Sequence, residues 1–150
     1  MPVDPFKIKE AADIIDTAKR PLILFGQGVI IGNAEEELKT FVEKTGIPAA
    51  WTLLGLSAMP TDHPLNVGML GMHGNYGPNF LTNEADVIIA VGMRFDDRVT
   101  GKTSVYAKNA KVIHLEIDPA EIDKIIKADV PVLGNSKKSL KMLIDNVKEN

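Results

Sequence analysis

Hydrophobic positions follow two different patterns along this chain of 150 residues. Short continuous apolar runs, such as 87–91, are typical of strands that are buried on both faces of a sheet. Segments with an apolar residue every three or four positions, such as 5–18, predict amphipathic helices. On this basis the expected strands are 21–25, 47–51, 87–91, 112–117 and 130–133, and the expected helices are 5–18, 34–44, 75–84, 119–126 and 136–147.

Residues with known preferences for helix ends support several of these boundaries. Asp4 precedes Pro5, which is a typical N-cap followed by proline at the first helical position. Asn33 and Asp118 are expected to cap the helices that follow them, and Gly46 is expected to end the second helix. Glycine and proline interrupt every period in 52–74, so this segment is expected to be a loop.

Strands that alternate with amphipathic helices indicate a parallel sheet with helices on both faces. No repeat, low-complexity tract or internal linker divides the chain. The prediction is therefore one α/β domain over residues 1–150: a three-layer, doubly wound parallel sheet of five or six strands, Rossmann-like, as in NAD- and FAD-binding domains.

Composition narrows the possible functions. The net charge of -3 argues against a nucleic-acid surface, which requires a clustered basic excess. The chain has no cysteine, so disulfides, thiolate metal sites and thiol nucleophiles are excluded, and a cytoplasmic location is expected. The apolar runs are too short to cross a bilayer, and residues 1–5 show no signal peptide, so no membrane partner is expected.

The residues that follow the expected strands are rich in glycine and in side chains suited to ligands. In an open parallel sheet, ligands bind beyond the carboxyl ends of the strands. Glycines allow a ligand to approach the backbone, and free N–H groups there can hold phosphate oxygens. Glu116, at a strand end, is suited to accept from ribose hydroxyls. These segments are 26–28, 52–55, 92–101, 116–118 and 134–135.

Each of these features also has a structural interpretation. Glycines after strands are usually turns, and the ordinary NAD fingerprint G-x-G-x-x-G is absent. Asp96 and Asp97 could form a solvated turn that the neighbouring arginines neutralise. The three histidines lie in separate segments, so no metal site is expected, and His114 is interpreted as a structural residue of a strand. No catalytic constellation is found.

Specific motifs take the interpretation further. The segments 70–74 (LGMHG), 85–92 (ADVIIAVG) and 94–101 (RFDDRVTG) resemble the large catalytic subunit of acetolactate synthases, and the last of them is the most specific. The similarity runs from about Arg20 to about Leu143. It implies the central, FAD-binding domain of this thiamine-diphosphate enzyme family. The pyrimidine-binding and diphosphate-binding outer domains, which hold thiamine diphosphate and Mg²⁺, would lie outside this chain.

The resemblance also implies roles for individual residues. Arg98 would attract the carboxylate of the second 2-oxoacid, and Asp97 would orient that arginine. Glu116 and Ile117 would hold the adenosine, and Gly134-Asn135 stands where the family commonly has Gly-Asp. The full set of implied FAD contacts is Gly26, Gly28, Thr52, Leu53, Leu54, Leu70, Gly71, Met72, His73, Gly92, Arg94, Arg98, Val99, Glu116, Ile117, Gly134 and Asn135.

By this resemblance, the whole enzyme condenses two pyruvates, or pyruvate and 2-oxobutanoate, with loss of CO₂ in branched-chain amino-acid biosynthesis. Its partners would be the outer domains, further copies of the catalytic subunit and a small regulatory subunit. No residue of this chain alone is expected to be catalytic, so the chain by itself is expected to be inactive. Two alternatives stay open: a free-standing module that binds FAD or another adenine nucleotide, and a purely structural scaffold.

Overall fold

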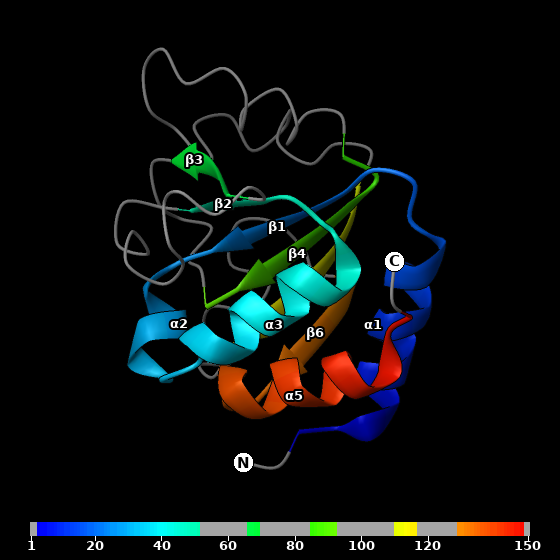
Figure 1. Cartoon of the computed structure of the whole chain (residues 1–150). Coiled ribbons are helices and arrows are strands. Elements are labelled where there is room, and N and C mark those ends of the chain that lie inside the picture. Colours follow the sequence, from blue (N-terminus) through cyan, green and yellow to red (C-terminus); the bar gives the residue numbers. More distant parts are fainter. Residues whose placement is uncertain (1–2, 52–65, 70–84, 93–109, 117–128, 149–150) are drawn as a thin grey trace.

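Six strands form one all-parallel sheet in the computed structural model, which describes residues 3–51, 66–69, 85–92, 110–116 and 129–148 (Figure 1). The strands are β1 (Pro21–Phe25), β2 (Ala49–Trp51), β3 (Asn66–Met69), β4 (Val87–Val91), β5 (Lys111–Glu116) and β6 (Val130–Leu133). Their order across the sheet is β3-β2-β1-β4-β5-β6. The chain thus builds outward from β1 in one direction and then from β4 in the other, which is the Rossmann order. The predicted fold class is confirmed.

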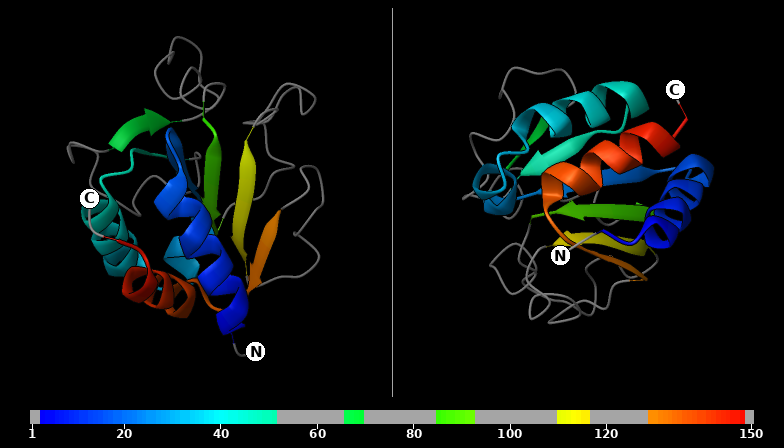
Figure 2. Two further views of the ribbon diagram at one scale, coloured as in Figure 1. Left: turned by 90° about the vertical axis from the view of Figure 1, so that its right-hand side faces the viewer. Right: turned by 90° about the horizontal axis from the view of Figure 1, so that it is seen from below.

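Three long helices cover one face of this sheet. They are α1 (Pro5–Thr17), α3 (Glu35–Thr45) and α5 (Ser136–Asn146), and Figure 2 shows all three on the same side, with α5 between the other two. Their apolar faces meet Ile23, Ile89 and Ile113 in the main core. On the opposite face the strand side chains, such as Leu24 and Ile88, are equally buried. The helices expected over 75–84 and 119–126 lie outside the described residues.

The helix ends show where local sequence decides the structure. Asp4 caps α1 as predicted, because its Oδ1 accepts from the N–H of Phe6 at 2.9 Å. Gly46 ends α3 in the left-handed conformation, also as predicted, with φ 71°. The expected cap at Asn33 is wrong: the N-cap of α3 is Ala34, and Asn33 has a φ of 55°. Asparagine tolerates this conformation, and here it links α3 to a preceding short helix.

That short helix, α2 (Gln27–Ile31), was not expected, and neither was β3. Helix α2 follows β1 directly, where two glycines in three residues indicated only a turn. Strand β3 falls within the segment that glycine and proline marked as a loop. It forms because β2 offers an unpaired edge, and its pairing to β2 shifts register between Ala49 and Ala50. In both cases tertiary contacts override a weak local preference.

Two aspartates join neighbouring strands at the amino edge of the sheet, the edge where the strands begin. The carboxylate of Asp86 accepts from the N–H groups of Lys19 and Arg20 at 2.7 and 2.8 Å. Asp129 accepts from the N–H of Val112 at 2.8 Å. Burial opposes ionisation of Asp86, but these backbone hydrogen bonds and the charge of Arg20 outweigh it and lower its pKa. Asp86 thus fixes the start of β4 beside the start of β1.

The lowered pKa of Asp86 predicts an acid-sensitive contribution to stability. The ionised carboxylate stabilises the fold above pH 3.8, its ordinary pKa, and this contribution is lost as the pH falls through the lower folded-state pKa. We expect Asp86→Asn to lower the free energy of unfolding at pH 7 by about 1–2 kcal/mol, since the side chain is partly exposed. The difference from the unaltered chain should shrink toward pH 2, as measured by urea unfolding.

Asp145, on the exposed side of α5, provides the matched control. Asp145→Asn should change the unfolding free energy by less than about 0.5 kcal/mol at either pH. An Asp86→Asn effect of the same size at pH 2 and pH 7 would contradict a role for the ionised carboxylate.

Candidate functional site

The carboxyl ends of all six strands meet at one edge of the sheet, where the strand arrows of Figure 1 point. Six of the predicted site residues are described and lie at this edge: Gly26, Gly28, Gly92, Glu116, Gly134 and Asn135. The others lie outside the described residues: Thr52, Leu53, Leu54, Leu70, Gly71, Met72, His73, Arg94, Asp97, Arg98, Val99 and Ile117. The described six come from β1, β4, β5 and β6 and the turns after them, so the topology gathers predicted residues more than 100 positions apart.

Gly28 and Gly92 touch each other backbone to backbone where the strand order reverses. A Cβ added to Gly28 would lie 2.5 Å from the Cα of Gly92, and one added to Gly92 would lie 2.6 Å from the Cα of Gly28. Both separations are far below van der Waals contact. Gly92 also has a φ of 58°, which residues other than glycine rarely adopt. Each glycine is therefore required by the other, and together they bring the ends of β1 and β4 into contact.

The N–H groups of the glycines at this edge are occupied by the protein itself. Gly26 donates to the carbonyl of Val91 at 3.1 Å, and Gly28 donates to that of Gly92 at 2.8 Å. The N–H groups of Gly92 and Gly134 donate in the same way to the carbonyls of Leu115 and Glu116, both at 3.0 Å. The expectation that such groups are free for phosphate oxygens is therefore wrong at these four positions. Each bond extends the ladder between neighbouring strands beyond their ends.

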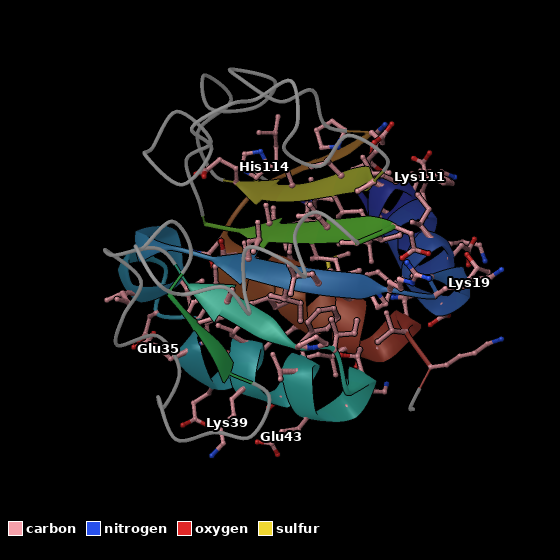
Figure 3. The ribbon with its side chains drawn as sticks, turned by 90° about the horizontal axis from the view of Figure 1, so that it is seen from above. Lys19, Glu35, Lys39, Glu43, Lys111 and His114 are labelled. Carbon is pink, nitrogen blue, oxygen red and sulfur yellow. The ribbon has the colours of Figure 1, made fainter. Side chains whose placement is uncertain are left out.

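A buried carboxylate ends β5, the strand next to β4 in the sheet. Glu116, the last residue of β5, has an exposed fraction of 8%, and its Oε2 lies 3.9 Å from the Nε2 of His114. His114 is completely buried. Figure 3 looks onto the sheet from the face opposite the helices and shows His114 in the half of β5 nearer the carboxyl edge. Sequence reasoning selected Glu116 but assigned His114 to the structure alone, since no spacing motif links the two.

Asn135 has a clear structural role. Its Oδ1 accepts from the N–H of Lys137 at 2.8 Å, which makes it the N-cap of α5. Asparagine and aspartate are about equally good in this position. An asparagine where the resembling family commonly has aspartate therefore preserves the start of α5. Sequence reasoning missed this cap, although an asparagine directly before a helical period was the available signal.

In the described part of the chain, no group of three or more histidine, aspartate or glutamate side chains is arranged to hold a metal ion. Within the same residues, no helix has the length and apolar character needed to cross a membrane.

The strand order and the glycine contact at its point of reversal define a Rossmann-like α/β domain, the class whose ligands bind at this edge. Comparison with known proteins identifies the family. The chain belongs to the thiamine pyrophosphate enzyme central domain family, whose sequence model matches residues 8–143.

Similar proteins include acetolactate synthases. The chain is 49% identical over 140 residues to the probable acetolactate synthase large subunit of Methanocaldococcus jannaschii, covering 93% of this chain and 24% of that protein. It is 44% identical over 142 residues to the acetolactate synthase large subunit of Corynebacterium glutamicum, covering 95% of this chain and 23% of that protein. The chain thus spans about a quarter of the length of these relatives.

Solved structures agree on the fold. A putative thiamin diphosphate-dependent enzyme from Mycobacterium smegmatis superposes with a TM-score of 0.83 at 24% identity, over 98% of this chain and 28% of that one. Benzoylformate decarboxylase from Polynucleobacter necessarius gives 0.84 at 22% identity, over 100% of this chain and 28% of that one. At these identities the likeness concerns the fold alone, so a cofactor has to be argued from the site.

The glycine contact predicts strongly coupled substitutions. We expect Gly28→Ala to destabilise the chain by about 1–3 kcal/mol, because the new Cβ meets backbone that cannot rotate away. Gly92→Ala should lower stability by about 1–2 kcal/mol more than that, because alanine is also strained at positive φ. The double variant should be less destabilised than the sum, since one displacement of the turn relieves both clashes. Thermal and urea unfolding of the three variants measure this coupling.

Gly46→Ala is the control for backbone conformation, because Gly46 has a similar φ at the end of α3. It should combine additively with Gly28→Ala. Additive losses in the Gly28 and Gly92 pair would show that the two glycines do not constrain each other.

Proposed function

We propose that this chain is the FAD-binding central domain of an acetolactate synthase large subunit. The observation that carries the proposal is the buried Glu116 carboxylate at the carboxyl edge, on the strand next to β4, where the second half of the sheet begins. Acidic residues at strand ends accept from ribose hydroxyls in dinucleotide sites of this fold. The relatives named acetolactate synthase, at 43–49% identity over nearly the whole chain, supply the family context.

The described residues suit the adenosine end of a dinucleotide. Glu116 provides an acceptor for ribose hydroxyls. The glycines beside it carry no side chain that could block an approach to the edge. The Oδ1 of Asn135 is engaged in capping α5, so the contact with adenine falls to its amide nitrogen. The glycine N–H groups at this edge already donate to backbone carbonyls, namely those of Gly26, Gly28, Gly92 and Gly134. These glycines would therefore let a ligand approach the backbone but would not donate hydrogen bonds to it.

The parts of the site that would bind the pyrophosphate and the flavin are formed, in this proposal, by the other residues that the family resemblance implies. Arg94 and Arg98 have the side chains that bind anionic oxygens in pairs. Arg98, oriented by Asp97, is proposed to receive the carboxylate of the second 2-oxoacid in the whole enzyme. The flavin would contribute a flat ring system close to the active site.

In the whole enzyme, this domain would lie between two further domains that hold thiamine diphosphate and Mg²⁺. We propose that the enzyme joins two pyruvates, or pyruvate and 2-oxobutanoate, with release of CO₂. It would act in the cytoplasm as an oligomer of catalytic subunits with a small regulatory subunit. The role of this chain would be to hold the dinucleotide and to shape the entrance for the second substrate.

One observation favours a second candidate, a purely structural scaffold. All four glycine N–H groups at the carboxyl edge are satisfied within the sheet, and Asn135 is accounted for as a helix cap. None of these residues needs a ligand to explain it. The position of Glu116 favours the nucleotide-binding candidate instead, because acidic residues at strand ends accept from ribose hydroxyls in dinucleotide sites of this fold.

Flavin binding separates the two candidates. We expect the chain to bind added FAD, but weakly enough to be purified without it, because the missing domains would supply part of the pocket wall. FMN, which lacks the adenosine, should bind at least about tenfold more weakly than FAD. Quenching of flavin fluorescence during titration measures both affinities.

Two substitutions sharpen this experiment. Glu116→Gln should weaken FAD and leave FMN nearly unchanged, because FMN does not reach the ribose contact. Glu36→Gln, at an exposed position of α3, should change neither affinity. No saturable FAD binding at millimolar protein, or equal affinities for FAD and FMN, would favour the scaffold.

The chain alone should not form acetolactate from pyruvate, even with thiamine diphosphate, Mg²⁺ and FAD present. The sequence shows no catalytic constellation, and the chain spans only about a quarter of the length of the relatives reported above. A colorimetric assay against a heat-denatured control tests this expectation. Product above that control would show that the chain carries a catalytic centre of its own.

A further inference from the structure

The last turns of the three long helices meet at the amino edge of the sheet. Helices α1, α3 and α5 all run back against the direction of the strands, and the right-hand view of Figure 2 shows the end of α5 between the ends of the other two. Each helix carries a partial negative charge at its carboxyl end, because its last carbonyl groups have no partner within the helix. Three such ends side by side repel one another, so this packing requires compensation.

Lys44 compensates two of these helix ends at once. It lies in the last turn of α3, where a cation suits the partial charge of its own helix. Its Nζ donates to the carbonyl of Ile144, which lies in the last turn of α5. This hydrogen bond is partly buried and joins residues 100 positions apart in the sequence. Helix α3 therefore supplies a cap for the end of α5.

Asp16 is harder to explain by its own helix. It is the second-last residue of α1, where the helix dipole disfavours a carboxylate. Its Oδ1 accepts from the N–H of Lys148 at 2.9 Å, two residues beyond the end of α5. Val147, just before Lys148, is buried in the core with an exposed fraction of 4%. The hydrogen bond to Lys148 gives the Asp16 carboxylate a role that the stability of α1 alone does not require.

We propose that Asp16 and Lys44 form a two-sided anchor, which fixes the direction in which the chain leaves the domain after α5. Helix α1 holds the backbone N–H that follows α5, and helix α3 holds a carbonyl of its last turn. The chain spans about a quarter of the length of its relatives. In any protein that continues after α5, the anchor would set the starting direction of the next segment. This inference does not depend on nucleotide binding.

Spin labels can measure this direction, because the chain has no cysteine of its own. One label is attached at Lys148→Cys, an exposed position whose backbone N–H is retained, and the other at Lys39→Cys on the exposed side of α3. Double electron–electron resonance then gives the distribution of distances between the labels. The labelled chain should show one narrow distribution. Asp16→Ala should broaden it by at least about twofold, because the N–H of residue 148 loses its acceptor.

Two further measurements follow the same anchor. Lys44→Met should also broaden the distribution, because it keeps most of the apolar stem and removes the donor to α5. In the unlabelled chain, Asp16→Ala should speed hydrogen exchange of the Lys148 amide by at least about tenfold. Helix α1 itself should stay intact in Asp16→Ala, since alanine is the better helix former and the unfavourable charge is removed.

The matched controls are Asp13→Ala, one turn earlier on the exposed side of α1, and Lys141→Met, on the exposed side of α5. Both should leave the width of the distribution and the exchange of the Lys148 amide unchanged. If Lys44→Met does not fold, as judged by circular dichroism, Asp16→Ala decides alone.

The alternative is that packing of Val147 alone holds this end of the chain. A broad distribution in the labelled chain without further substitutions would overturn the anchor. A narrow distribution and slow exchange that persist in Asp16→Ala would also overturn it, in favour of Val147. Neither result would bear on the proposed FAD binding, which is measured separately at the carboxyl edge.

Discussion

The close approach of Gly28 and Gly92 is the constraint on which the carboxyl edge depends. At this point the chain has built β1 and its neighbours on one side and begins again with β4 on the other. Two turns must therefore leave adjacent parallel strands in the same place. The absence of side chains lets them touch, and the bond from Gly28 N–H to Gly92 carbonyl fixes the contact. Helix α2 starts from this turn, and the Gly92 N–H extends the same ladder to β5.

The two edges of the sheet carry different polar side chains. Both faces are buried, so strand interiors are almost wholly apolar, and polar side chains collect where strands begin and end. At the amino edge, Asp86 and Asp129 form short hydrogen bonds to backbone N–H groups of neighbouring elements. At the carboxyl edge, His114 and Glu116 face each other across the longer distance of 3.9 Å. The first arrangement holds neighbouring elements together, and the second lies at the edge where ligands bind in domains of this fold.

The elements that sequence predicts well are those whose signal is local. Strands β1, β4 and β6 are continuous apolar runs, and α1 combines a helical period with Asp4 and proline at its start. Strand β3 has no such signal, because it depends on the edge that β2 offers, and a single chain does not reveal this pairing. Helix α2 is not predicted from the sequence, because the glycine within it indicates a turn.

The candidate site shows the same division. Sequence selected the edge at which the strands end and the carboxylate that lies there, since both follow from the position of residues after strands, and their role in binding a ligand stays a prediction. It misjudged the glycine N–H groups, because glycine spacing does not reveal which carbonyl lies opposite. It also missed that Asn135, assigned to a ligand, caps α5 through its Oδ1. In each case the sequence gives the type of residue, but it does not show which atoms that residue forms hydrogen bonds with.

These occupied donors change how a ligand could act on this domain. In a site whose N–H groups are free, a bound phosphate completes the hydrogen bonding of the turn and stabilises it. Here the N–H groups of the four glycines are paired without a ligand, since they donate to backbone carbonyls. Binding would therefore require little ordering of the described backbone directly after β1 and β4. Ligand choice would then depend on side chains such as Glu116, which are attached to backbone that is already hydrogen-bonded without the ligand.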